Sequence, residues 1–260
     1  MEPSERNALL LSEARFHRSR LIELPSALKP QTTDEAYVVR ERVVDQWLAH
    51  YGGTISGYKI ACTNASAQQY LNLDGPFYGN LLSALSFESP AQVNAGDFFM
   101  RVIEAEFAFL VGHDLEPGPH SQQEIADAIE GVLPGIEIVD SRYTSWTTMG
   151  AEALIADNAC HGAWIKGAVV RDWRAIDLAA QEVQLHVNGN LVGTGSGAAV
   201  LGHPLRALEW LVNKLASHGK GLKAGQYITT GVTTDTYMAE AGDHIRADFG
   251  RVGSIEVTFE

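Results

Sequence analysis

The most constraining feature of the sequence is an apolar stretch, residues 101–111, that carries two glutamates. Its β-branched and aromatic residues and the glycine that follows are typical of a buried strand. Because side chains alternate along a strand, Glu104 and Glu106 point to the same face. A solvated strand face is the simpler alternative, but the run continues into residues 107–111, which look buried on both faces. Paired buried carboxylates repel each other, so we expect a divalent cation with oxygen ligands between them.

A third acidic residue interrupts a second apolar strand. Glu137 lies within residues 135–140, between isoleucines. Three carboxylates without clustered histidine or cysteine favour Mg²⁺ or Mn²⁺ over zinc, because these cations prefer oxygen ligands. The alternative is that Glu137 pairs with Arg101 or Arg142.

Lys59 is a candidate proton-transfer group. It follows Gly57 and Tyr58 in a strand-like run, residues 56–62, where its ammonium would be partly desolvated. Burial and a nearby cation both lower a lysine pKa, which makes general acid or base chemistry accessible near neutral pH. The alternative is a lysine that extends to solvent from a strand edge.

Residues 157–162, Asp-Asn-Ala-Cys-His-Gly, form a polar segment that suggests a loop entering a pocket. Cys160 and His161 are adjacent, and neighbours on an extended chain face opposite sides, so we do not expect a thiolate–imidazole pair. A glycine-rich run at residues 193–197 lacks the Lys-Ser/Thr of a phosphate-binding loop, which argues against nucleotide binding.

Composition limits the partners. The net charge of −13 over 260 residues argues against a nucleic-acid partner, whose phosphates would be repelled. Two cysteines are too few for a disulfide framework, so we expect a reducing, cytoplasmic location. The N-terminus lacks the apolar core of a signal peptide, and no apolar run approaches the roughly 20 residues that span a bilayer. We therefore expect no membrane partner.

The spacing of apolar residues predicts an α+β fold, because regular βαβ alternation is missing. Helices are expected where apolar residues recur at helical spacing, with Ser4 and Ser121 as caps of the first and the fourth: 2–18, 33–51, 64–71, 121–130 and 204–217. Strands are expected at 56–62, 101–110 and 135–140, with a hairpin at 180–194, whereas 79–95 reads as loop. We expect residues 1–55 to form a helical N-terminal region packed on a catalytic domain, residues 56–260.

Several motifs together resemble the hydratase/decarboxylase branch of the fumarylacetoacetase superfamily. They are Gly57-Tyr58-Lys59-Ile60 with Thr63, Glu104-Ala105-Glu106, the run from Gly135 to Arg142, Ala156-Asp157-Asn158, and the run from Gly195 to Pro204. The resemblance implies a mixed β-sandwich or β-roll with flanking helices and a homo-oligomer. It also implies Mg²⁺ or Mn²⁺ held by Glu104, Glu106 and Glu137.

The activity implied by this resemblance is hydration of a 2-hydroxy-2,4-dienoate to a 4-hydroxy-2-oxo acid, in the meta-cleavage catabolism of aromatic compounds. The alternatives are a decarboxylase of the 4-oxalocrotonate type, an acylpyruvate hydrolase, or a non-catalytic protein that binds oxo acids. The same metal and lysine serve the enzymatic routes, so the pocket residues decide among them.

The resemblance also assigns roles to pocket residues. Lys59, Asp157 and His161 are the expected catalytic residues. The substrate-binding positions are expected at Thr63, Phe77, Asn158, Cys160, Thr230 and Gly231. The chain departs from the hydratase pattern where many relatives have an acid, here Phe77, and where they have a serine pair, here Cys160 and His161.

Overall fold

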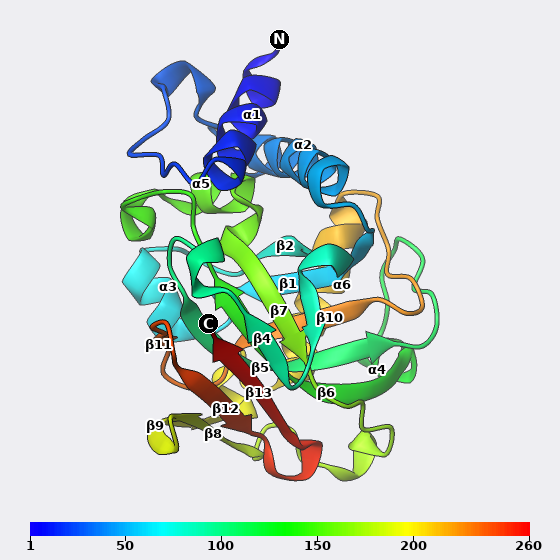
Figure 1. Ribbon diagram of the computed structural model, residues 1–260. Coiled ribbons are helices and arrows are strands. Elements are labelled where there is room, and N and C mark those ends of the chain that lie inside the picture. The colour runs from blue at the N-terminus through cyan, green and yellow to red at the C-terminus, as the bar shows by residue number, and fades with distance from the viewer.

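Two β-sheets form the centre of the computed structural model, which describes all residues 1–260 (Figure 1). The larger sheet has the strand order β2-β1-β10-β5-β6-β7-β3, with β11 pairing with β5. Its strands are β1 (Ile55–Ala61), β2 (Phe77–Leu82), β3 (Ser86–Glu88), β5 (Val102–Val111), β6 (Ile129–Val139), β7 (His161–Lys166), β10 (Tyr227–Val232) and β11 (Tyr237–Met238). The smaller sheet has the order β4-β13-β12-β8-β9, formed by β4 (Ala91–Val93), β8 (Glu182–Val187), β9 (Asn190–Ser196), β12 (His244–Asp248) and β13 (Ser254–Phe259).

The main hydrophobic core contains 54 buried residues, drawn from both sheets and the helices. Phe107 on β5 meets Phe249, which follows β12, edge to face at 5.1 Å between ring centroids. Alternation along β5 therefore turns Ile103, Ala105, Phe107 and Phe109 to this core and places Glu104 and Glu106 on the opposite face.

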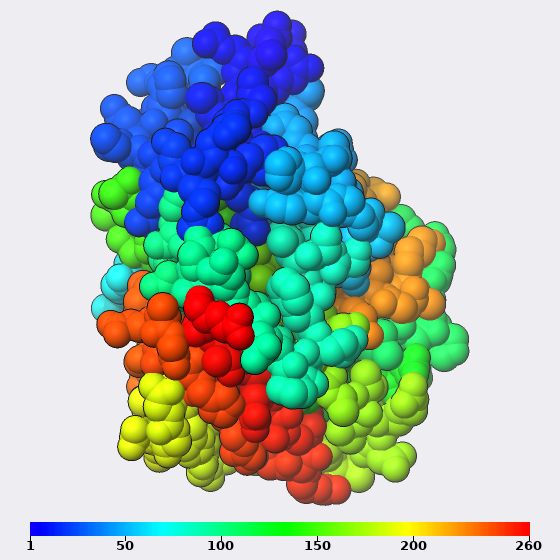
Figure 2. Space-filling model, in the orientation of Figure 1, coloured from blue at the N-terminus to red at the C-terminus, as the bar shows by residue number.

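Six α-helices surround the sheets. They are α1 (Pro3–Phe16), α2 (Thr33–Tyr51), α3 (Ala65–Leu71), α4 (Gln122–Asp127), α5 (Ala151–Ala156) and α6 (Pro204–Ser217). The first two form a hairpin at one end of the molecule, where their residues occupy a separate region of the surface (Figures 1 and 2). A second core of ten buried residues joins this hairpin to the rest, with Leu11 and Trp47 packing alongside Tyr143 and Ala153. None of the helices is long and apolar enough to cross a membrane.

The α+β prediction is confirmed, and so are the hairpin at Asn188-Gly189 and the capping box of Ser121 and Glu124. The loop expected at 79–95 is wrong, because β2 is an edge strand buried on both faces and shows no alternation to read. The helix expected to reach residue 130 ends at Asp127, since the chain then enters β6 and pairs along the length of β5. Glu2, rather than Ser4, caps α1.

Candidate metal centre and catalytic lysine

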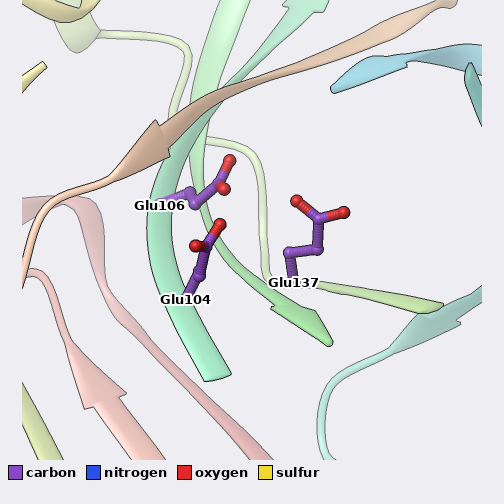
Figure 3. A group of neighbouring side chains, drawn as sticks. All are labelled: Glu104, Glu106 and Glu137. Carbon is purple, nitrogen blue, oxygen red and sulfur yellow. The ribbon is translucent and has the colours of Figure 1, made fainter. Parts of the chain in front are cut away.

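Strand register brings the three glutamates together. Glu104 on β5 lies directly opposite Glu137 on β6, and Glu106 follows two residues later on the same face. Figure 3 shows the three carboxylates converging from these two neighbouring strands. An oxygen from each glutamate lies within 4.8 Å of the others.

Register also carries Lys59 to this face. Lys59 on β1 is paired with Thr229 on β10, and Thr229 is paired in turn with Ala108 on β5, two residues beyond Glu106. The Lys59 Nζ lies 3.1 Å from Oε2 of Glu137 and donates a hydrogen bond of 2.9 Å to the carbonyl of Ala159. The lysine is therefore buried with an acidic partner and does not extend to solvent.

Burial and charge shift the pKa values of the acids in opposite directions. Burial raises the pKa of Glu104 to about 7, and burial with the two neighbouring carboxylates raises the pKa of Glu106 well above its usual range. Burial also opposes the charge of Glu137, but Lys59 and His161 outweigh it and lower the pKa of that carboxyl. For Lys59, burial works against the charge, but the three glutamates outweigh it, so the lysine pKa is raised and not lowered as burial alone would predict.

The arrangement fits a divalent cation. Glu106 and Glu137 are fully buried, and Oε1 of Glu106 has no hydrogen-bond partner. Three ionised carboxylates and one ammonium leave two negative charges, which a divalent cation would neutralise. The donor set consists of carboxylate oxygens, which Mg²⁺ and Mn²⁺ prefer. Neither Arg101 nor Arg142 pairs with Glu137, so the alternative ion pairs considered from the sequence do not form.

His161 lies against the same cluster. At the start of β7, its Nδ1 is 3.2 Å from Oε1 of Glu137, and its Nε2 is buried without a partner. Burial lowers the pKa of the imidazole more than Glu137 raises it. The structure thus brings together Lys59 and His161 on the two oxygens of Glu137.

Two of the expected substrate-binding residues, Gly231 and Thr63, lie next to each other, and Gly231 contacts Glu106. The amide of Gly231 donates a hydrogen bond of 3.0 Å to Oε2 of Glu106. A Cβ at Gly231 would lie 1.9 Å from Oγ1 of Thr63, so only glycine lets these two segments approach this closely. The Thr63 hydroxyl is buried and has no partner, which leaves it available to a bound molecule.

The other expected positions differ in what they contact. Phe77 is opposite Ala61 on the Lys59 face of the sheet, two residues along β2 from the partner of Lys59. The Thr230 hydroxyl donates to the carbonyl of Phe107 and is thereby engaged with the backbone. Its neighbour Thr229, which the sequence reasoning missed, is paired with Lys59 and has a buried hydroxyl without a partner.

Asp157 is held by Arg142 and does not reach the glutamates. The Arg142 side chain donates to Oδ1 of Asp157, while its backbone amide and the hydroxyl of Ser141 donate to Oδ2. The side-chain amide of Asn158 is hydrogen-bonded to the backbone of Asn80. It accepts from the Asn80 N–H at 2.7 Å and donates to the Asn80 carbonyl at 3.0 Å. Burial raises the pKa of the Cys160 thiol, so a thiolate is disfavoured there.

Comparison with known proteins identifies the class. Residues 77–260 match the family described as fumarylacetoacetate (FAA) hydrolase C-terminal, and the chain belongs to this family. It is 31% identical to 2-keto-4-pentenoate hydratase of Paraburkholderia xenovorans (strain LB400), over 100% of this chain and 97% of that protein. It is 34% identical to 2-hydroxyhexa-2,4-dienoate hydratase of Comamonas testosteroni, covering 80% of this chain and 79% of that protein.

A solved structure is similar over the whole fold. The 4-oxalocrotonate decarboxylase from Pseudomonas putida G7, complexed with magnesium and adipate, superposes with a TM-score of 0.91 at 28% identity. The similarity covers 99% of this chain and 97% of that one. Hydratases and a decarboxylase are therefore both similar to this chain along most of its length, and the expected family is confirmed.

Proposed function

We propose that the protein is a lyase that requires Mg²⁺ or Mn²⁺ and adds water to a 2-hydroxy-2,4-dienoate, giving a 4-hydroxy-2-oxo acid. The observation that carries the proposal is the buried cluster of Glu104, Glu106 and Glu137 with Lys59 in contact with it. The full-length similarity to 2-keto-4-pentenoate hydratases supports the substrate class, and the magnesium in the decarboxylase structure supports the metal.

In this proposal the three glutamates hold the metal. When bound, the cation supplies Lewis-acid stabilisation of negative charge on the oxygens of the 2-oxo acid. Lys59 moves a proton at C3 of the substrate. The negative charge of the glutamates raises the lysine pKa, so a cation that offsets this charge would make the Lys59 proton easier to release.

The remaining pocket residues orient the substrate or a water molecule. Thr63 and Thr229 offer buried hydroxyls without partners to the oxygens of the substrate. The Glu137 carboxylate holds the ring of His161, whose free Nε2 is available to a water molecule. We further propose that Phe77, which is paired with Ala61 on the Lys59 face of the sheet, gives the pocket an apolar surface.

A decarboxylase of the 4-oxalocrotonate type is the second candidate. The structural similarity to the Pseudomonas putida enzyme, over almost the whole of both chains, favours it. The same metal and lysine would stabilise the electrons left behind when CO₂ departs. We place hydration first because 2-keto-4-pentenoate hydratases align with the full length of this chain, whereas the sequence similarity to a 4-oxalocrotonate decarboxylase covers 80% of it.

A parallel assay tests the proposal. The purified protein is supplied with Mg²⁺ or Mn²⁺, and dienol loss, CO₂ release and acylpyruvate cleavage are followed side by side. We expect metal-dependent dienol consumption without CO₂, abolished by chelation and restored by the added metal. CO₂ release would select the decarboxylase, and acylpyruvate cleavage would select a hydrolase with His161 near the water. No turnover in any arm would favour a non-catalytic oxo-acid-binding protein.

We also propose that the protein acts as a cytoplasmic homo-oligomer, on the resemblance to its family. Light scattering at micromolar concentration measures the subunit number. A monomer would contradict this part of the proposal.

A further inference from the structure

Residues 158–160 form an unusual turn beside the glutamate cluster. Asn158, Ala159 and Cys160 have φ values of 50°, 53° and 57°, which places three consecutive non-glycine residues in the left-handed region. All three are buried. Left-handed conformations are unfavourable for residues with a Cβ and persist only where the surroundings impose them.

Contacts before and within the turn hold this conformation. Before the turn, the Asp157 carbonyl accepts a hydrogen bond of 2.7 Å from Arg142, whose side chain also binds the Asp157 carboxylate. Within the turn, the side-chain amide of Asn158 is bonded to both the N–H and the carbonyl of Asn80 on β2. The turn is thus tied to two separate elements through buried polar groups.

A glycine on β2 makes the close approach possible. A Cβ at Gly79 would lie 2.5 Å from the carbonyl oxygen of Asn158, which is too close for any residue other than glycine. Gly79 is also the residue directly opposite Lys59 in the pairing of β1 with β2. The turn therefore packs over the sheet at the position from which the catalytic lysine projects.

The turn presents one group to that lysine. The carbonyl of Ala159 accepts a hydrogen bond of 2.9 Å from Lys59 Nζ, whose other polar contact is Oε2 of Glu137 at 3.1 Å. Two acceptors in fixed directions determine where the remaining N–H of the ammonium points. A long, flexible lysine side chain has no such direction by itself.

We propose that the left-handed turn 158–160 is a positioning device, in which Asn158 locks the Ala159 carbonyl so that it aims Lys59 at the reacting carbon. Asn158 and Ala159 act through Lys59 and do not themselves transfer a proton. This inference rests on the proposed function for its catalytic meaning. The orientation of the ammonium is a structural consequence that can be measured without turnover.

The test compares three variants. Asn158→Ala removes both hydrogen bonds to Asn80, and Asn158→Gly removes them while tolerating the left-handed φ, so we expect it to fold even if the alanine variant does not. Asn188→Ala is the matched control: Asn188 also has a left-handed φ, of 51°, and also makes two side-chain hydrogen bonds, to Asp243 and to the amide of His244 in the smaller sheet.

Three measurements are made on each variant: Mg²⁺ affinity by calorimetry, deuterium exchange at C3 of pyruvate with Mg²⁺, and the ¹H–¹⁵N NMR signal of the Lys59 ammonium, assigned with Lys59→Arg. An ammonium held by two acceptors and shielded from water exchanges its protons slowly and gives a sharp signal. We expect both Asn158 variants to broaden or lose this signal and to slow C3 exchange by about 10–100-fold, the range for a misplaced catalytic group. Mg²⁺ affinity should be unchanged, and Asn188→Ala should match the wild type in all three.

Two results would overturn the inference: an unaltered Lys59 signal in Asn158→Gly, or a C3 exchange rate equal to that of the wild type. A merely structural role for Asn158 would lower stability in the Asn158 and Asn188 variants alike and leave the ammonium signal in place. If the wild type itself shows no exchange and no turnover, the proposed function fails, while the NMR signal still decides whether the turn orients Lys59.

Discussion

Two buried charge clusters lie close together in this protein and are built in opposite ways. In one, Glu104, Glu106 and Glu137 face Lys59, so acids outnumber bases. In the other, Arg142 and Asp157 form an ion pair with both partners fully buried. Every carboxylate oxygen of Asp157 accepts a hydrogen bond, whereas Oε1 of Glu106 has no partner.

This difference separates structural charge from functional charge. In a buried ion pair with satisfied hydrogen bonds, each charge is compensated by its partner. A cluster with excess negative charge and an unpartnered oxygen is incomplete, and a cation completes it. The raised pKa values of Glu104 and Glu106 express the same imbalance, because protonation is the other way to remove the charge.

We call the cluster of Glu104, Glu106, Glu137 and Lys59 the unbalanced cluster. Removing its base, Lys59, should have the largest effect. Lys59→Ala takes away the proposed proton-transfer group, and such groups contribute about 10²–10⁴-fold in rate, so turnover should fall by that factor. Mg²⁺ affinity should be retained, because the glutamates remain and lose a competing positive charge. Steady-state kinetics and calorimetry measure the two quantities.

Lys59→Arg is the control for this prediction. A guanidinium keeps the positive charge but stays protonated near neutral pH, so it should not restore turnover. If arginine restores most of the rate, Lys59 acts only through its charge, and His161 becomes the better candidate for proton transfer.

Breaking the ion pair of Arg142 and Asp157, which we call the balanced cluster, should lower stability instead. Asp157→Ala leaves the Arg142 guanidinium buried without its carboxylate, and removal of one partner of a buried pair costs about 3–5 kcal/mol of unfolding free energy. Urea denaturation measures the loss. The double variant Arg142→Met with Asp157→Leu removes both charges, and we expect it to be more stable than Asp157→Ala alone. A double variant as unstable as the single one would show that hydrogen bonds, and not the stranded charge, account for the loss.

Most substitutions in a protein core lower its stability, but removing one acid from the unbalanced cluster should raise it. Glu106→Gln relieves repulsion among the glutamates, so the metal-free protein should become more stable, while metal binding and activity are lost. In the wild type, Mg²⁺ at about 100 times its Kd should add about 2.7 kcal/mol of stability, and in the variant it should add nothing. Thermal unfolding with and without Mg²⁺ checks both statements, and a stabilisation by Mg²⁺ that survives in Glu106→Gln would remove Glu106 from the ligand set.

The sequence was enough to predict the unbalanced cluster but not the balanced one. Alternation places Glu104 and Glu106 on one face of a strand, and an acid inside an apolar strand, Glu137, is visible in the sequence. The contact of Arg142 with Asp157 depends on how a loop returns to the sheet, which no local pattern encodes. Asp157 was accordingly expected to be catalytic, and the structure places its carboxylate on Arg142.

The same limit explains the errors in the fold. The edge strand β2 is buried on both faces and lacks the alternating polar residues that Glu104 and Glu106 provide in β5. The unpaired hydroxyl of Thr229 was missed in favour of Thr230, since neighbouring threonines differ only in the face to which register assigns them. Knowledge of the strand order would have separated the two, because it pairs Thr229 with Lys59.

The smallest effect is expected where the N-terminal helices touch the balanced cluster. Arg15 on α1 donates hydrogen bonds to the carbonyls of His161 and Gly162, at 3.1 and 2.9 Å, and lies 4.4 Å over the ring of Trp47. Arg142 donates to the same His161 carbonyl at 3.1 Å, so the two arginines share it.

Arg15→Lys keeps the charge but loses the planar guanidinium whose two N–H groups reach both carbonyls, and we expect a loss of about 1–2 kcal/mol in unfolding free energy. Turnover should change little, because Arg142 still holds His161. Arg6→Lys, at an exposed position on the same helix, should leave stability unchanged within about 0.5 kcal/mol. A large drop in turnover for Arg15→Lys, with Mg²⁺ affinity intact, would mean that the N-terminal helices position His161 and that the balanced cluster does not hold it alone.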